Sequence, residues 1–167
     1  MANVITEQRI IDSNKRALIK YVGTLDTAAA NTIILDASSL NLALNTNGQI
    51  MSANADIKSN YRTTVKRIFG YAKANAYIKL QWVGDTNTSI VTIGTGAFDY
   101  SFDAMGDGAV INNPEANATG DIALTVVTPS SADTLTLFVD LRKDSRDYDA
   151  GQTADPTAFN RGPARFI

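Results

Sequence analysis

Cysteine and histidine are both absent from this chain of 167 residues. Without cysteine there is no disulfide, no thiol nucleophile and no zinc site built from cysteine and histidine. Without histidine there is no Ser-His-Asp triad, and the commonest general base near neutral pH is missing. Only carboxylate chemistry and oxygen-ligand metal sites remain open. We therefore expect a protein that is not an enzyme and that uses no metal or cofactor.

Long apolar runs and an excess of basic charge are also missing. No apolar run approaches the roughly 20 residues that a membrane-spanning helix needs. The N-terminal segment MANVITEQRI lacks the basic start and the apolar stretch of a signal peptide. A net charge of -2 gives no broad basic footprint for nucleic acid. We therefore expect neither a membrane nor a nucleic acid as a partner.

Short alternating runs of apolar and polar residues, separated by turn residues, fill most of the chain. In residues 134–142 the three leucines and Val139 share one face, with Phe138 on the other, and in residues 77–83 Trp82 lies on an apolar face. Eight or nine short strands with few helical features predict an all-β fold, an antiparallel β-sandwich of two sheets. A jelly roll is the arrangement that we expect. The inward residues predicted for these two runs are Ile78, Leu80, Trp82, Leu135, Leu137, Val139 and Leu141.

The chain divides into one sandwich domain and two terminal segments. Residues 1–15 are expected to be an N-terminal arm or a first strand, residues 16–142 the sandwich, and residues 143–167 an extended C-terminal arm. Within the sandwich, Gly70 interrupts a predicted strand and indicates a bulge or a close backbone approach. That strand is predicted to place one set of side chains on a single face: Val65, Arg67, Phe69 and Tyr71.

The C-terminal arm has neither the period of a helix nor the alternation of a strand. Its mixed charges suit ion pairs between subunits, and its few apolar residues suit a strap that binds a groove or adds a strand to a neighbouring sheet. The alternative is an arm that packs on its own domain. The residues predicted to form the subunit interface are Tyr148, Phe159, Arg161, Arg165, Phe166 and Ile167.

Two acidic or glycine-rich patterns have a functional and a structural interpretation. Asp99, Asp103 and Asp107 resemble an oxygen-rich calcium loop, but their spacing does not match an EF-hand, and solvated turn aspartates are favoured. Gly94 and Gly96 bracket one residue as in a phosphate loop, but the lysine and the following helix are missing. A connection between two strands is favoured there.

Trp82 and a basic stretch of the chain also have both a functional and a structural interpretation. Trp82 suits the core better than a sugar-binding platform, because it is in phase with apolar neighbours. A basic stretch with interleaved Tyr61 and Tyr71 has the composition of a single-strand nucleic-acid site. An exposed sheet face or a subunit contact is favoured instead. The basic residues of this stretch are Lys58, Arg62, Lys66, Arg67, Lys73 and Lys79.

Seven segments, taken in order, resemble a class of small virion structural proteins from tailed bacteriophages. The segments are RALIKYVG, TIILDASSL, VKRIFGYA, YIKLQWVGDT, IGTGAFDYS, ATGDIALTV and TLTLFVDLRK, and they span about residues 16–143. The resemblance implies a non-enzymatic β-sandwich protein of the virion, assembled in the cytoplasm of the bacterial host. The residues that match the motifs of the class are Leu80, Trp82, Gly94, Gly96, Phe98, Asp99, Thr119, Gly120, Asp121 and Ile122.

The first functional hypothesis is a protein that decorates or cements the capsid as a homo-oligomer. Its expected partners are the major capsid protein or other virion proteins. A head-to-tail connector in the neck, or a tail component, is the structural alternative. A carbohydrate-binding module with Trp82 or Tyr100 as platform, and a hydrolase that uses Asp99 and Asp103, are the alternatives from other classes.

Overall fold

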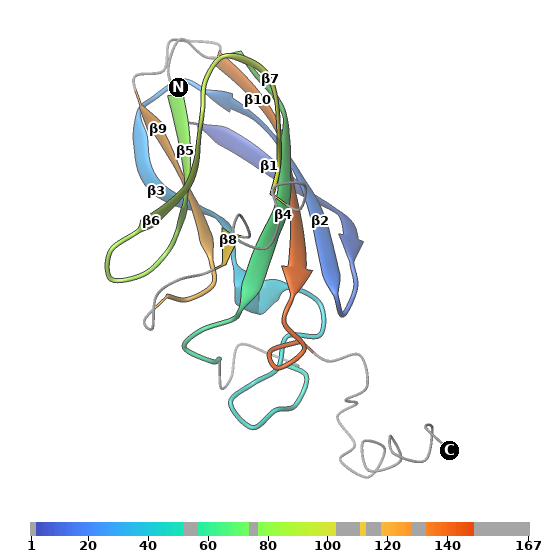
Figure 1. Cartoon of the computed structure of the whole chain (residues 1–167). Coiled ribbons are helices and arrows are strands. Elements are labelled where there is room, and N and C mark those ends of the chain that lie inside the picture. Colours follow the sequence, from blue (N-terminus) through green and yellow to red (C-terminus); the bar gives the residue numbers. More distant parts are fainter. Residues whose placement is uncertain are drawn as a thin grey trace.

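Two antiparallel sheets pack against each other in the computed structural model, which describes residues 3–51, 57–73, 77–102, 111–112, 118–127 and 133–148 (Figure 1). Sheet A has the order β1 (Val4–Asp12), β2 (Arg16–Leu25), β10 (Asp133–Lys143), β4 (Thr63–Lys73) and β7 (Gly96–Ser101), and the short β8 (Ile111–Asn112) pairs with β4. Sheet B has the order β3 (Ala29–Leu35), β9 (Ile122–Val127), β5 (Tyr77–Trp82) and β6 (Thr88–Ile93). The predicted all-β sandwich of two sheets is confirmed.

The N-terminal segment is a strand of the sandwich. β1 pairs antiparallel with β2 from Val4, opposite Thr24, to Asp12, opposite Ala17, and lies at one end of sheet A. From β2 onward the chain passes repeatedly between the sheets. As a result β2 and β10, which are far apart in sequence, are neighbours in sheet A.

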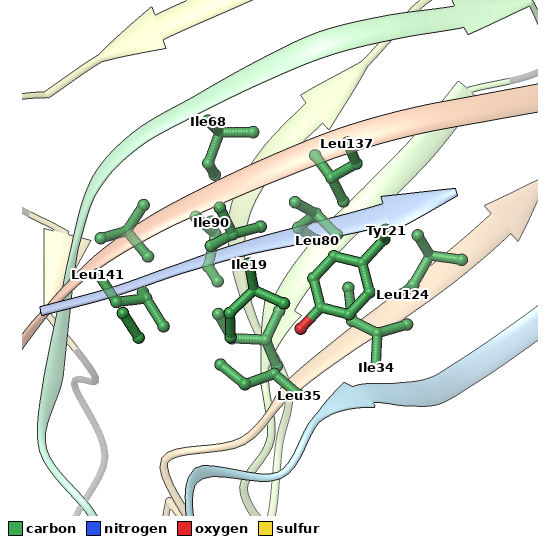
Figure 2. Close-up of a cluster of buried hydrophobic side chains, with 14 of the residues drawn as sticks. Ile19, Tyr21, Ile34, Leu35, Ile68, Leu80, Ile90, Leu124, Leu137 and Leu141 are labelled. Carbon is green, nitrogen blue, oxygen red and sulfur yellow. The ribbon is translucent and has the colours of Figure 1, made fainter. Parts of the chain in front are cut away.

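The core lies between the two sheets and is built from the apolar faces of their strands. The inward residues predicted for β5 and β10 are all buried, with at most 1% of each side chain exposed. Figure 2 shows side chains from sheet A, such as Ile19 and Leu137, facing Leu80 and Leu124 of sheet B. Each fully buried leucine or isoleucine contributes about 1.5–3 kcal/mol. This part of the core could be predicted because apolar residues recur at every second position along β5 and β10.

The predicted face of β4 is wrong in part, because the strand contains a bulge. Val65 pairs with Leu141 and Arg67 with Asp140, so Lys66 is an extra residue between two consecutive partners. The extra residue reverses the alternation. Val65, before the bulge, therefore lies on the inner face of the sheet together with Ile68 and Ala72. Arg67, Phe69 and Tyr71, after the bulge, lie on the outer face. The inward residues of β4 are Val65, Ile68 and Ala72.

Tyr21 provides a first test of the core. Its side chain is buried, burial raises the pKa of its hydroxyl, and that hydroxyl has no hydrogen-bond partner among the described residues (Figure 2). Because a buried polar group without a partner costs about 1–3 kcal/mol, Tyr21→Phe is expected to leave the free energy of unfolding unchanged or to raise it by about 1 kcal/mol. Urea denaturation measures this value.

The matched control is Tyr148→Phe, because the Tyr148 hydroxyl donates to the Ala37 carbonyl at 2.8 Å. This variant is expected to lose about 1 kcal/mol. A comparable loss in Tyr21→Phe would show that the Tyr21 hydroxyl does have a partner in solution.

Candidate assembly surfaces

The start of the C-terminal arm, residues 143–148, is here called the arm root. It begins with Lys143, of which only 4% is exposed. The Lys143 ammonium pairs with the Asp12 carboxylate and donates to the Asn41 carbonyl at 2.9 Å. Burial lowers the pKa of Lys143, and the hydrogen bond and charge of Asp12 oppose that shift. The end of β10 is thus fastened to β1 and to the loop that follows β3.

Asp147 fastens the arm root to the segment that leads into β4. Its carboxylate is 2% exposed and accepts hydrogen bonds from the Arg62 backbone amide at 2.9 Å and the Arg62 guanidinium at 2.9 Å. The Lys58 ammonium lies 3.2 Å from the same carboxylate. Burial would raise the pKa of Asp147, but the hydrogen bonds from Arg62 and Lys58 outweigh it and lower the pKa. No local pattern in the sequence indicates this buried cluster.

Tyr148 completes the arm root, and its position corrects the predicted interface. The side chain is 1% exposed, and its ring lies against Tyr61 with a centroid distance of 5.7 Å. The Tyr61 hydroxyl donates to the Leu44 carbonyl at 2.8 Å, and the Leu44 amide donates to the Asp147 carbonyl at 2.9 Å. Tyr148 therefore packs inside its own chain and does not offer its side chain to a neighbouring subunit. The other predicted interface residues, Phe159, Arg161, Arg165, Phe166 and Ile167, lie outside the described residues.

The ion pairs of the arm root also differ from the prediction of contacts between subunits. Arg146 pairs with Asp144 at 2.8 Å, and Lys143 and Asp147 have the intrachain partners given above. The hydrogen bond from Arg146 holds the pKa of Asp144 at about 2. These charges therefore stabilise the turn that follows β10.

A second surface is the outer face of sheet A, defined by the outward side chains of β2, β10, β4 and β7. Phe138 of β10 lies directly opposite Phe69 of β4, and the two rings stack with a centroid distance of 4.7 Å and planes 3° apart. Lys20 of β2 lies over the Phe138 ring at 5.8 Å, and the Arg67 guanidinium lies over the Phe69 ring at 4.6 Å. These four side chains form a row across three strands.

Exposed apolar side chains lie beside this row. Val22 is 44% exposed and Tyr71 is 52% exposed. Both pair with Thr136 on the central strand β10, so they lie on either side of it. Exposed apolar side chains that gather on one face of a sheet are typical of an interaction surface. The sequence shows this patch only once the bulge in β4 and the strand order are known.

Comparison with protein-family models, curated proteins and solved structures finds no match to this chain. The geometry of the chain is therefore the basis for assigning a role. Among the described residues, no helix is long and apolar enough to cross a membrane.

The structure separates the residues of the predicted basic stretch. Lys58 and Arg62 hold the arm root, and Arg67 lies on the outer face of sheet A. Lys79 lies over the Tyr77 ring at 5.5 Å in sheet B. The stretch therefore does not form one continuous surface.

Asp99 has a structural partner. Its carboxylate accepts two hydrogen bonds from Arg67 at 2.6 and 2.8 Å, and those bonds lower its pKa. Asp103 and Asp107 lie outside the described residues. Within the described ranges no group of acidic residues is arranged to hold a metal ion. The geometry at Asp99 is that of a surface ion pair across β4 and β7.

Trp82 belongs to the core, with 1% of the side chain exposed. The interpretation as a sugar-binding platform is therefore wrong for this residue, and the core interpretation is confirmed. Tyr100 is 36% exposed on β7, which lies at the other end of sheet A from β1. Gly94 and Gly96 lie at the connection between β6 and β7, as predicted.

Proposed function

We propose that this chain is a non-enzymatic structural protein of a phage virion, which decorates or cements the capsid through contacts of the sandwich and the C-terminal arm. One observation carries the proposal. Eight strands pair in a nested order: β2 with β10, β3 with β9, β4 with β7, and β5 with β6. This order supports a jelly roll, a ribbon of paired strands folded over into two facing sheets. Jelly rolls recur in viral capsid domains.

The resemblance to small virion proteins of tailed phages covers the same strands, because its motifs run from β2 to β10. The arm root supports the use of the arm as a strap. Lys143, Asp147 and Tyr148 are all buried and attached to segments that are distant in sequence. A pull on the arm would therefore act on the whole sandwich and would not simply unravel β10.

Deletion of residues 151–167 tests the role of the arm. We expect the truncated domain to fold with a free energy of unfolding within about 0.5 kcal/mol of the full chain, because the arm root remains. We also expect its incorporation into particles to be lost. Urea denaturation measures the first quantity, and quantitative mass spectrometry of purified virions measures the second.

The matched control keeps the arm at full length and replaces only polar residues, Gln152, Thr153 and Thr157, with alanine. A second full-length variant replaces the apolar residues Phe159, Phe166 and Ile167 with serine. We expect the control to be incorporated into particles and the serine variant to be excluded. Normal incorporation of the truncated chain would rule out the arm as a strap.

The number of copies per virion separates the two structural locations. A lattice of decoration sites on the shell requires hundreds of copies, whereas a connector in the neck forms a closed ring with few copies. The same mass spectrometry measures the ratio of this chain to the major capsid protein. Only a few copies of this chain per virion, as in one ring, would favour the neck.

A further inference from the structure

The outer face of sheet A is more basic than the chain as a whole. The net charge of the chain is -2. On this face, however, only Asp99 and Asp140 are acidic among the charged outward residues of β2, β10, β4 and β7. The strand pairing places these residues together although they are far apart in sequence. The basic residues that share the face are Arg16, Lys20, Arg67, Lys73 and Arg142.

A pocket of about 380 Å³ lies at the end of this face where β10 ends. Among the described lining residues Asp140 is the single carboxylate, and the Arg16 guanidinium binds both of its oxygens at 2.8 Å. Asp140 thus pairs with Arg16, and the lining holds four basic residues to this one carboxylate among the described residues. The positive potential suits the carboxylate of an incoming acidic side chain. The lining residues are Lys15, Arg16, Lys66, Asp140, Leu141 and Arg142.

The aromatic row does not suit a nucleic acid. Single-stranded nucleic acids bind by stacking bases on exposed aromatic faces. Here the inner faces of Phe69 and Phe138 cover each other, while Arg67 and Lys20 lie over the rings. The ring edges, with the exposed Val22 and Tyr71 beside them, suit apolar side chains of a protein.

We propose that the outer face of sheet A docks an acidic surface of another protein. Carboxylates of that partner enter the pocket beside Arg142, and its apolar side chains cover Val22 and Tyr71. A second copy docked through the same face would oppose cation to cation, which costs several kcal/mol. The inference extends the proposed function by naming the chemistry of the partner surface, and it does not depend on the C-terminal arm.

The test uses the full purified chain and a fluorescein-labelled peptide rich in glutamate and leucine. Fluorescence anisotropy is expected to show binding that weakens with salt, and weaker binding of a peptide with glutamine in place of glutamate. Lys15→Glu/Arg142→Glu is expected to weaken binding of the acidic peptide about tenfold or more. Val22→Ser/Tyr71→Ser, which removes exposed apolar area only, is expected to weaken it about fivefold.

The matched control is Tyr77→Ser/Lys79→Glu, which makes the same kinds of change on sheet B, where Tyr77 is 41% exposed. Its binding is expected to equal that of the unmodified chain, and urea denaturation checks that all variants are folded. Equal peptide binding by all three variants would overturn the proposal. So would tighter binding of an oligothymidylate of matched charge, or a dimer in sedimentation that Val22→Ser/Tyr71→Ser dissociates. Because no virion is involved, these outcomes are independent of the deletion experiment.

Discussion

Gly70→Ala is expected to lower the free energy of unfolding by about 4 kcal/mol. Gly70 lies in β4 between Leu137 of β10 and Phe98 of β7, so both sides of the residue are occupied. A Cβ atom at this position would lie 2.0 Å from the Thr136 carbonyl oxygen, and the backbone has a φ of 152°. The side chain of alanine therefore adds a steric clash with backbone to a conformation that glycine tolerates best. The strands of sheet A would have to separate at their centre.

Substitutions at two other glycines separate the cost of the steric clash from the cost of the backbone conformation. Gly96 also has a positive φ, 112°, but a Cβ atom there would meet nothing within 4 Å. Gly96→Ala is expected to cost about 1–2 kcal/mol, from the backbone conformation alone. Gly94 has open space as well, and no positive φ is found there. Gly94→Ala is expected to change stability by less than about 0.5 kcal/mol.

Urea denaturation of the three variants measures the midpoints and the slopes of unfolding. The slopes should stay the same, because the surface exposed on unfolding hardly changes. Equal losses for Gly70→Ala and Gly96→Ala would mean that sheet A adapts to the added methyl group without cost, and would contradict the argument from close approach.

Gly70 also illustrates what could be predicted from the sequence. A glycine within a strand of alternating residues indicates a close backbone approach, and the structure confirms it at Thr136. The same reasoning missed the bulge at Lys66, because a bulge is defined by the partner strand and leaves no mark on its own strand. The prediction that these four side chains share a face was therefore right for Arg67, Phe69 and Tyr71 and wrong for Val65.

The two candidate surfaces were less accessible to sequence reasoning for different physical reasons. The outer face of sheet A brings together β2, β10 and β4, and strand order cannot be inferred from the alternation within each strand. The arm root has no periodicity, so the burial of Asp147 and Tyr148 depends entirely on tertiary partners such as Arg62 and Tyr61. Polar clusters of this kind are visible only when the loops that surround them are placed.

Asp147→Ala is expected to lower the free energy of unfolding by about 3 kcal/mol near neutral pH. The substitution removes the acceptor of the Arg62 backbone amide and the partner of two cations in one step. Arg62 is 41% exposed and Lys58 is 22% exposed, so water partly replaces the lost contacts and keeps the cost at the lower end of that for a broken buried pair. The arm root would lose its attachment to the segment that leads into β4.

The pH dependence of unfolding identifies the carboxylate charge as the cause. The pKa of Asp147 is lower in the folded chain than in the unfolded chain, so the unfolded chain takes up the proton first as the pH falls. The stability that Asp147 contributes is therefore fully present above about pH 4 and is lost as the pH falls through the folded pKa. The difference between the unmodified chain and Asp147→Ala should shrink accordingly in urea denaturation between about pH 7 and pH 3.

Asp144→Ala is the control for this prediction, because Asp144 is a neighbouring acidic residue whose partner Arg146 is 67% exposed. Solvent screens this pair, so its loss is expected to cost less than about 1 kcal/mol near neutral pH. The pKa of Asp144 is about 2, so the part of stability that it contributes also disappears in acid. If Asp147→Ala cost the same at neutral and at acid pH, the lost stability would come from packing, and the carboxylate would not be what fastens the arm root. If instead the cost falls as the pH is lowered, the charge of Asp147 is what holds the segments around Arg62 and Lys58 to the arm root.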